Sequence, residues 1–223
     1  MKYVSIDIET TGLDPENHEI LSVGIVIEDT SLKLDPENLP TLHIGILHEE
    51  IRGSLFAINM NNDILKKILG YQGAKTVEEK AEYEKSNRMV FRKKEDVVVE
   101  IYRFLFRNGF VDFTPEEMQQ SEIIDGVRYP LIGSKNPPAR INAAGKNFST
   151  FDKVFLEKLP RWKQLMRTRQ RVLDPGILFV DWQNDEALPT LQTCKDRAGI
   201  QGQVTHDALE DAIDVIMVMR KFY

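Results

Sequence analysis

Several protein classes are excluded by what this chain of 223 residues lacks. It contains a single cysteine, Cys194, so an intramolecular disulfide is impossible. No apolar run reaches the ~18 residues that a membrane span needs. The first residues lack the long apolar stretch and small-residue cleavage site of a signal peptide. We therefore expect a cytoplasmic protein in a reducing compartment, with no membrane association.

Positive charge is also scarce, because 29 Lys and Arg face 35 Asp and Glu, for a net charge of −6. This balance argues against a protein that binds nucleic acid mainly through its overall charge. The argument is weaker if the carboxylates cluster around divalent cations, which would reverse the local sign. The apolar content of 42% is that of an ordinary globular protein. Its length predicts one domain, residues 1–223, with insertions at about 73–95 and 112–138.

Hydrophobic periodicity predicts an α/β protein. Near the N-terminus Val4, Ile6 and Ile8 alternate with Asp7 and Glu9, as the period of a strand requires. Three early strands with short connections predict an antiparallel meander, and the later helices are expected to cover the sheet. The predicted strands are 2–9, 20–28, 42–47, 140–144 and 171–173, and the predicted helices are 60–69, 96–106, 152–159, 188–198 and 208–221.

Two segments fit this pattern poorly. Residues 73–95 are densely charged with both signs, which favours a solvated helix or a mobile insertion over a binding element. Residues 112–138 have no clear period, although 123–132 reads as a hairpin around Asp125-Gly126. We interpret both segments as insertions.

Asp7 and Glu9 form the first candidate site. Because they are two residues apart on a strand, both carboxylates leave the same face, roughly 6.5–7 Å apart along the chain. Two buried carboxylates repel each other and lose hydration, which is costly unless a cation lies between them. Mg²⁺ prefers such oxygen ligands. An Asp-x-Glu on an exposed face is nevertheless common in acidic chains, so the pair alone is weak evidence.

Three more residues complete the candidate set. Asp152 begins a predicted helix, where a carboxylate interacts favourably with the helix dipole. His206 precedes the last helix and Asp211 lies inside it. A histidine suits general-base catalysis because its ordinary pKa is near neutrality. A structural role is the alternative, since Asp207 and Glu210 fit an N-cap with a capping box, and most isolated histidines are not catalytic.

Three segments, taken together, resemble the motifs of a known family. They are residues 5–13 (SIDIETTGL), 147–152 (NFSTFD) and 206–211 (HDALED). Their order and spacing resemble the DEDDh (DnaQ-like) 3′–5′ exonucleases, which include the proofreading epsilon subunit of DNA polymerase III, RNase T and oligoribonuclease. The resemblance implies an RNase H-like mixed sheet, with three antiparallel strands followed by parallel strands, flanked by helices.

The resemblance also implies a catalytic site. The four carboxylates would hold two divalent cations, Mg²⁺ or Mn²⁺, and the histidine would deprotonate the attacking water. Activity is then expected to require metal, because four clustered negative charges would otherwise repel the substrate phosphate. The predicted metal ligands are Asp7, Glu9, Asp152 and Asp211, and the predicted general base is His206.

Substrate contacts follow from the same resemblance. The Thr10 position lies near the terminal 3′-OH in the family, and the Leu13 position is wedged against the base. Gly12 would let backbone amides approach the ligand closely. Residues 53–61 resemble a segment that lines the nucleotide pocket. The predicted substrate-binding residues are Thr10, Gly12, Leu13, Asn59, Met60, Asn147 and Phe151.

The densest basic run lies at residues 161–171, where five arginines and lysines alternate with other residues. This run either tracks a phosphate backbone or forms a solvated face, and the sequence favours neither.

We therefore expect a metal-dependent 3′–5′ exonuclease that releases 5′-mononucleotides from the 3′ ends of single-stranded DNA or RNA. An inactive relative that binds nucleic acid or a protein partner is the alternative. An RNase H-like endonuclease is a third possibility, against which the spacing of His206 and Asp211 counts. The sequence leaves open the choice of DNA or RNA, the pathway, the protein partners and the oligomeric state, a homodimer included.

Overall fold

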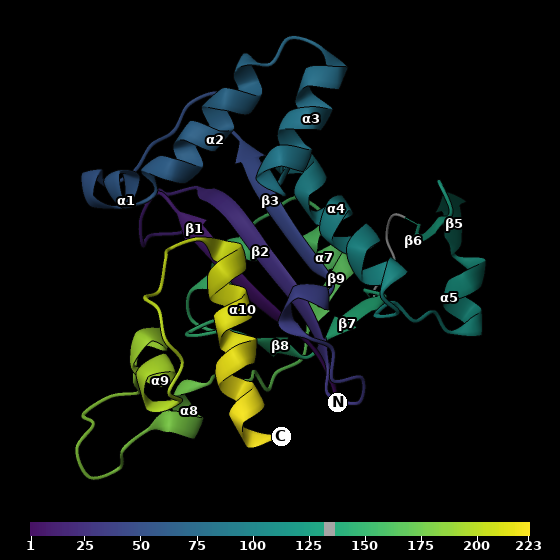
Figure 1. The fold of residues 1–223 in the computed structure, drawn as a ribbon. Coiled ribbons are helices and arrows are strands. Elements are labelled where there is room, and N and C mark those ends of the chain that lie inside the picture. The colour runs from purple at the N-terminus through teal and green to yellow at the C-terminus, as the bar shows by residue number, and fades with distance from the viewer. Residues whose placement is uncertain (132–136) are drawn as a thin grey trace.

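The computed structural model describes residues 1–131 and 137–223, and a five-stranded mixed sheet forms its centre (Figure 1). β1 (Lys2–Thr10) pairs antiparallel with β2 (Ile20–Asp29) and parallel with β8 (Ala143–Ala144). β3 (Thr41–Leu47) pairs antiparallel with β2, and β4 (Val90–Lys93) pairs parallel with β3. The strand order is β4-β3-β2-β1-β8. The predicted mixed sheet, with an antiparallel meander followed by a parallel strand, is confirmed.

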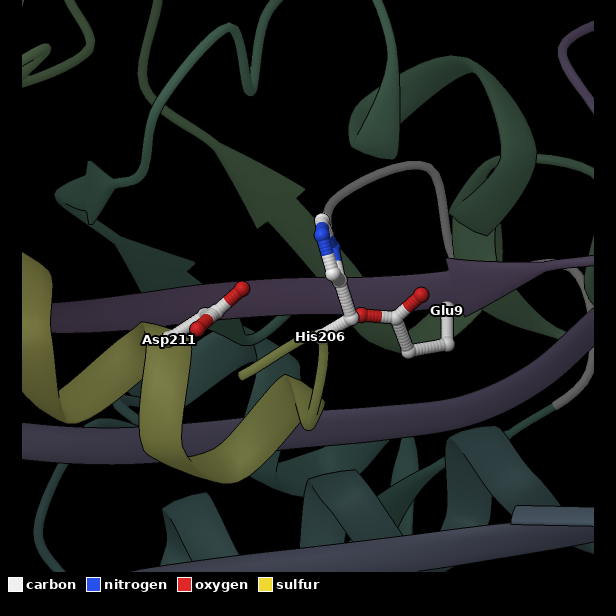
Figure 2. Close-up of side chains that lie close together, drawn as sticks. All are labelled: Glu9, His206 and Asp211. Carbon is white, nitrogen blue, oxygen red and sulfur yellow. The ribbon is translucent and has the colours of Figure 1, made fainter. Parts of the chain in front are cut away.

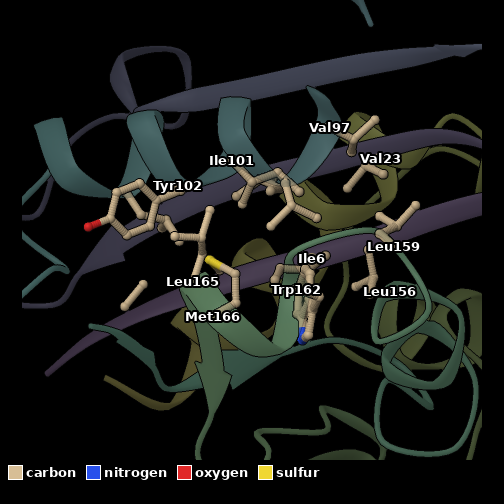
Figure 3. Packing of buried hydrophobic residues seen from close by; sticks show 14 of the residues in the cluster. Ile6, Val23, Val97, Ile101, Tyr102, Leu156, Leu159, Trp162, Leu165 and Met166 are labelled. Carbon is tan, nitrogen blue, oxygen red and sulfur yellow. The ribbon is translucent and has the colours of Figure 1, made fainter. Parts of the chain in front are cut away.

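Helices cover both faces of this sheet. On one face α4 (Lys94–Arg107) presents Val97 and Ile101 to Ile6 of β1, within a large buried apolar cluster (Figure 3). On the other face α10 (Ala208–Met219) packs against β1 and β2, and its Val215 shares a second cluster with Tyr3. Each fully buried side chain of this size contributes about 1.5–3 kcal/mol to folding. The alternation of β1 thus assigns its odd-numbered residues, Asp7 and Glu9 among them, to the α10 side.

Among the described residues, no helix is both long and apolar enough to cross a membrane.

Further helices and strands surround the central layers. The remaining helices are α1 (Leu55–Met60), α2 (Asn62–Gly73), α3 (Val77–Asn87), α5 (Pro115–Gln119), α6 (Asp152–Leu156), α7 (Trp162–Leu165), α8 (Gly176–Phe179) and α9 (Leu191–Arg197), with 3₁₀ turns at Pro36–Asn38 and Arg220–Phe222. The remaining strands are β5 (Ser121–Ile124), β6 (Val127–Pro130), β7 (Ala139–Ile141) and β9 (Met166–Thr168).

Two predicted strands need correction. The segment 140–144 is interrupted at Asn142, whose side-chain amide donates to the Lys2 carbonyl at 3.0 Å, so β7 and β8 join different sheets. The strand predicted at 171–173 is wrong, because the partner of β7 is β9, five residues earlier. Of the residues 171–173, only Leu173 pairs with a strand, through an isolated parallel bridge to Ala144. In both segments, pairing with a strand that is distant in the sequence determines where the strand forms. The apolar pattern of one segment carries no information about which strand it pairs with.

The charged segment 73–95 contains two different structures. Its first part is the solvated helix α3, which has a capping box at Thr76 and no buried residue. Its last part is β4, which the sequence analysis missed because a four-residue edge strand inside a run of charges shows no clear alternation.

The helices are largely where periodicity predicts them, but their ends differ. The predicted helix 60–69 corresponds to α2, and the predicted helix 152–159 corresponds to the shorter α6. The hairpin predicted around Asp125-Gly126 is confirmed, and both turn residues have positive φ, as a two-residue hairpin turn requires. Ile132, at the end of that predicted hairpin, lies outside the described residues.

Candidate active site

All five predicted catalytic residues line one pocket of about 570 Å³, which we call the acidic cleft. They come from three elements that are far apart in the sequence. Asp7 and Glu9 lie near the end of β1, Asp152 begins α6, and Asp211 lies in the first turn of α10 with His206 just before it. The fold thus brings together side chains that the sequence separates by up to 204 positions.

The end of β1 has a rigid backbone. The register of β1 on β2 shifts between Glu9 and Thr10, so the strand bends as it enters the cleft. The Thr10 hydroxyl donates to the Gly12 carbonyl at 2.8 Å, and the Asn61 amide donates to the Thr10 carbonyl at 3.0 Å. A side chain at Gly53 would lie 2.4 Å from the Thr11 carbonyl oxygen, so this close approach requires glycine. These contacts hold the backbone that directly follows Glu9.

Asp152 is held against β1. Its Oδ1 accepts from the Ile8 backbone amide at 3.1 Å, next to the two carboxylates of the strand. The turn before it, residues 147–151, is closed by amides of Thr150 and Phe151 that donate to the Asn147 carbonyl. Asn147 itself has φ of +59°, a left-handed conformation that asparagine tolerates better than most residues. The turn therefore directs Asp152 inward at the start of α6.

The segment before α10 positions His206. Asp207 is the N-cap and accepts from the amides of Leu209 and Glu210, whereas His206 has φ of +55°. Asp207 also lies 3.5 Å from the Lys67 ammonium and 3.8 Å from His43. The N-cap predicted from sequence is thus confirmed. The predicted capping box is not, because among the described residues the Glu210 side chain forms no hydrogen bond with the Asp207 amide.

Gly24 of β2 lets this helix start lie against the sheet. A methyl group at position 24 would lie 2.1 Å from the Ala208 carbonyl oxygen. The absence of a side chain there allows α10 to begin directly over β2, and so near the end of β1.

The imidazole of His206 and the carboxylates of Glu9 and Asp211 form a compact group (Figure 2). One ligand atom from each lies within 4.8 Å of the other two. Glu9 and Asp211 are buried, and His206 is exposed at the mouth of the cleft. Such a group has the donor atoms and the spacing of a cation site.

The cleft disfavours negative charge. Burial raises the pKa of Glu9 to about 8, with a further increase from Asp211, although a hydrogen bond with Asn61 opposes it. Burial likewise raises the pKa of Asp152 to about 7 and that of Asp211 to about 7. The pKa of Asp7 is raised by burial and then by the neighbouring carboxylates, Asp152 first. Each group is easier to protonate here than in water, because its charge is desolvated. Neighbouring carboxylates also repel the charges of Asp7, Glu9 and Asp211.

These residues fit divalent cations. Carboxylate oxygens are ligands that Mg²⁺ and Mn²⁺ favour. Among the described residues, the buried Asp211 Oδ1 has no hydrogen-bond partner, which is costly for a carboxylate unless something else binds it. A bound cation would compensate both this atom and the mutual repulsion of the four acids.

The predicted substrate-binding residues, with one exception, also line the acidic cleft. They are Thr10, Gly12, Leu13, Met60, Asn147 and Phe151. Asn59 is the exception, because the helix α1 turns Ala57 and Met60 toward the cleft and leaves Asn59 exposed outside it. Leu13 is 82% exposed, so its apolar side chain is free to contact a ligand.

Sequence reasoning missed several residues of the lining, notably Phe56 and Lys146. Phe56 lies one turn before Met60 on α1 and is 78% exposed. Lys146 immediately precedes the second motif, and its ammonium lies 2.9 Å from Asn147 Oδ1 and 3.4 Å from Asp174. A helical reading of residues 55–60 would have identified Phe56, since residues i and i+4 share a face.

Comparison with known proteins identifies the fold but no family. No protein-family model matches the chain, and no curated protein sequence matches it. Solved structures of exonuclease I do match. The E. coli enzyme in complex with a dT13 oligonucleotide is 14% identical, with a TM-score of 0.52 over 99% of this chain. A zinc-bound E. coli complex with single-stranded DNA gives 13% and 0.54, again over 99% of this chain.

Exonuclease I from Methylocaldum szegediense, a moderately thermophilic enzyme, gives similar values of 14% identity and a TM-score of 0.52 over 99% of this chain. In all three comparisons the matched region is 40% of the exonuclease I chain, so this chain spans less than half the length of those proteins. At such identity the likeness concerns the fold. The mixed sheet flanked by helices, as the resemblance to 3′–5′ exonucleases implied, is the fold found in exonuclease I.

Proposed function

We propose that this protein is a metal-dependent 3′–5′ exonuclease that removes 5′-mononucleotides from the ends of single strands. One observation carries the proposal: four carboxylates and a histidine from β1, α6 and α10 converge in one cleft, within a fold shared with exonuclease I. Chance rarely gathers so much like charge in a buried place, because burial of unpaired carboxylates is strongly unfavourable.

The metal-binding roles follow from the site. Asp7, Glu9, Asp152 and Asp211 would hold two divalent cations, Mg²⁺ or Mn²⁺. When bound, such cations supply charge that stabilises the attacking and leaving oxygens of a phosphodiester displacement.

The protein's own groups have separate tasks. His206, exposed at the mouth of the cleft and close to two of the carboxylates, removes the proton from the attacking water. The bent end of β1, from Thr10 to Leu13, contacts the terminal nucleotide, and the exposed Leu13 side chain packs on its base. Asn147, Phe151 and Met60 line the remainder of the cleft around that nucleotide.

Single-stranded DNA is the first substrate to test. The exonuclease I structures that share this fold were solved with a dT13 oligonucleotide and with single-stranded DNA. Nothing in the cleft is specific enough to exclude RNA, because recognition of the 2′-OH depends on one or two contacts.

The test is digestion of 5′-labelled single-stranded DNA and RNA of matched sequence, with Mg²⁺, with Mn²⁺ and with EDTA. A ladder that shortens from the 3′ end and requires metal supports the proposal, and the faster substrate identifies the class. A protein that binds both strands but cleaves neither would instead be the inactive relative. Cleavage of a circular single strand would indicate an endonuclease.

A further inference from the structure

A second charged cavity lies away from the acidic cleft. It has a volume of about 610 Å³ and is lined by Arg140, Asn142, Arg167, Thr168, Arg169, Gln170 and Arg171, and we call it the basic groove. In a chain with a net charge of −6, four arginines in one groove are a marked concentration of positive charge.

The strand pairing forces these arginines together. β7 and β9 run parallel and side by side (Figure 1), with Arg140 directly opposite Arg167. The Arg169 amide continues the ladder by donating to the Ile141 carbonyl at 2.9 Å. Because side chains alternate along a strand, Arg140 and Arg167 leave the same face of the pair, and Arg169, one position past β9, lines the groove with them. Their neighbours Ala139, Ile141 and Met166 are buried on the opposite face.

The protein itself compensates little of this charge. Arg140 lies 3.7 Å from Glu117. Within residues 1–131 and 137–223, the side chains of Arg167, Arg169 and Arg171 form no ion pair, and all three are exposed. Like charges directly opposite on neighbouring strands destabilise a sheet. The arrangement therefore favours binding of an anion with several charges.

The groove and the cleft lie at the two ends of one short segment. Asn142 bonds to Lys2, where β1 begins, whereas Lys146 lines the acidic cleft, where β1 ends. Arg140 and Lys146 are six positions apart, a span of at most about 20 Å at about 3.3 Å per residue. A stacked strand rises by about 3.4 Å per nucleotide along its axis, so the span corresponds to a few nucleotides.

We propose that the basic groove binds the sugar–phosphate backbone of the substrate strand, on the 5′ side of the nucleotide held in the acidic cleft. This inference rests on the proposed function for its direction along the strand. Guanidinium groups pair well with phosphates, and backbone contacts of this kind are independent of sequence. The groove would thus hold the part of the strand that is not being cleaved.

The experiment compares two variants of equal charge. R140Q/R167Q/R169Q removes three charges from the groove. K33Q/K75Q/K85Q removes three exposed lysines from elsewhere on the surface, none of which has an ion-pair partner among the described residues. Binding of fluorescein-labelled single-stranded DNA of 4 or 20 nucleotides is measured by anisotropy, in EDTA and over a range of KCl. EDTA removes attraction through cations in the acidic cleft, so the basic surface dominates.

For the 20-mer, the slope of log affinity against log salt should become shallower by about 2 in the arginine variant, at ~0.7 for each phosphate that the protein no longer neutralises. The lysine variant should keep the slope of the wild type, and R140K/R167K/R169K should restore it. With the tetranucleotide, whose three internal phosphates must be shared between the two sites, the arginine variant should differ less from the wild type.

An unchanged slope for the 20-mer in the arginine variant would overturn the proposal. So would 20-residue poly-glutamate that binds the wild type as tightly as the 20-mer, because the groove would then select an acidic polypeptide. The two proposals can fail separately. If the protein never cleaves but shows the arginine-dependent slope, the proposed exonuclease function is wrong and the proposed role of the basic groove stands. If it cleaves normally but the slope is unchanged, the exonuclease function stands and the role of the groove is wrong.

Discussion

The acidic cleft and the basic groove concentrate charges of opposite sign near opposite ends of β1, and they differ in burial. In the cleft, Glu9, Asp152 and Asp211 are at most 6% exposed, so their repulsion is scarcely screened by water. In the groove the arginines are exposed, and water and salt screen them. We therefore expect the proposed cations to be held tightly in the first cluster, and the proposed polyanion to be held weakly in the second. Burial, more than the number of charges, sets the strength and specificity of each site.

The largest expected difference between the two regions is in catalysis. Asp7→Asn and Asp152→Asn should each remove most activity, because they remove proposed metal ligands, and His206→Ala should lower kcat by about 10²–10⁴-fold through loss of the proposed general base. Single-turnover digestion of labelled single-stranded DNA measures this. Asp35→Asn, a change of equal charge at an exposed site, is the control. If all three cleft variants cleave at the wild-type rate, the assignment of the site is wrong.

His206→Ala also separates two roles. If the imidazole acts only as a base, the concentration of Mn²⁺ that gives half-maximal activity should stay the same. If that concentration rises along with the loss of rate, His206 is a cation ligand, as its distance of less than 4.8 Å from both carboxylates also permits.

The second expected difference between the cleft and the groove is in how each affects the pH dependence of folding stability without metal. Glu9, Asp152 and Asp211 have pKa values raised from about 4 to about 7–8, so the folded state binds more protons than the unfolded state between these values. Their contribution to the free energy of unfolding should therefore fall as pH rises from about 4 to 8. Saturation with Mg²⁺ at about 100 times its Kd should restore about 2.7 kcal/mol, equivalent to a Tm rise of roughly 5–10 °C.

Thermal unfolding in EDTA and in Mg²⁺, across that pH range, measures this effect. Asp7→Asn should raise the Tm in EDTA at pH 8 and reduce the response to metal. A Tm in EDTA that increases steadily up to pH 8 would mean that ionisation of the cleft carboxylates does not destabilise the folded state. The groove variant R140Q/R167Q/R169Q should respond to Mg²⁺ as the wild type does.

A smaller effect is expected at the rim of the cleft. Phe56 is exposed and lines the cleft, so Phe56→Ala should weaken binding of a terminal base by about 1–3 kcal/mol, the usual contribution of aromatic stacking. The KM for single-stranded DNA should rise by about 5-fold to about 150-fold, because 1.4 kcal/mol corresponds to one decade. Leu55→Ala is the control, since Leu55 is 87% exposed on the same helix and lies outside the cleft lining. Equal KM values for the two variants would remove Phe56 from the substrate contacts.

The smallest effect concerns the groove alone. Arg167→Gln should raise the free energy of unfolding by about 0.2–1 kcal/mol, because it removes the like charge opposite Arg140. The gain should shrink as salt is added. Urea unfolding at low and high KCl measures it, and a loss of stability at low salt would show that the two arginines do not repel each other.

The candidate site residues were easier to name from the sequence than the boundaries of several elements. They were identified because three motifs resemble those of a known family, whereas the strand period of Asp7 and Glu9 and the N-cap Asp207 only predicted the elements that carry them. By contrast, β4 and β9 were not predicted, since each is held in place by a partner strand rather than by its own pattern. Asn59 lies outside the cleft lining because residues 55–60 form a helix with distinct faces, which reading 53–61 as one segment did not take into account.

By itself the sequence determined the alternation of β1, which assigns Asp7 and Glu9 to the face opposite Val4, Ile6 and Ile8. That is a local property, since the period of two follows from the geometry of any strand. Only the tertiary structure decided that Asp152 and Asp211 meet this face, and that Arg140 lies beside Arg167. Those contacts depend on strand order and on the packing of α10 over Gly24, and interactions between distant segments determine both.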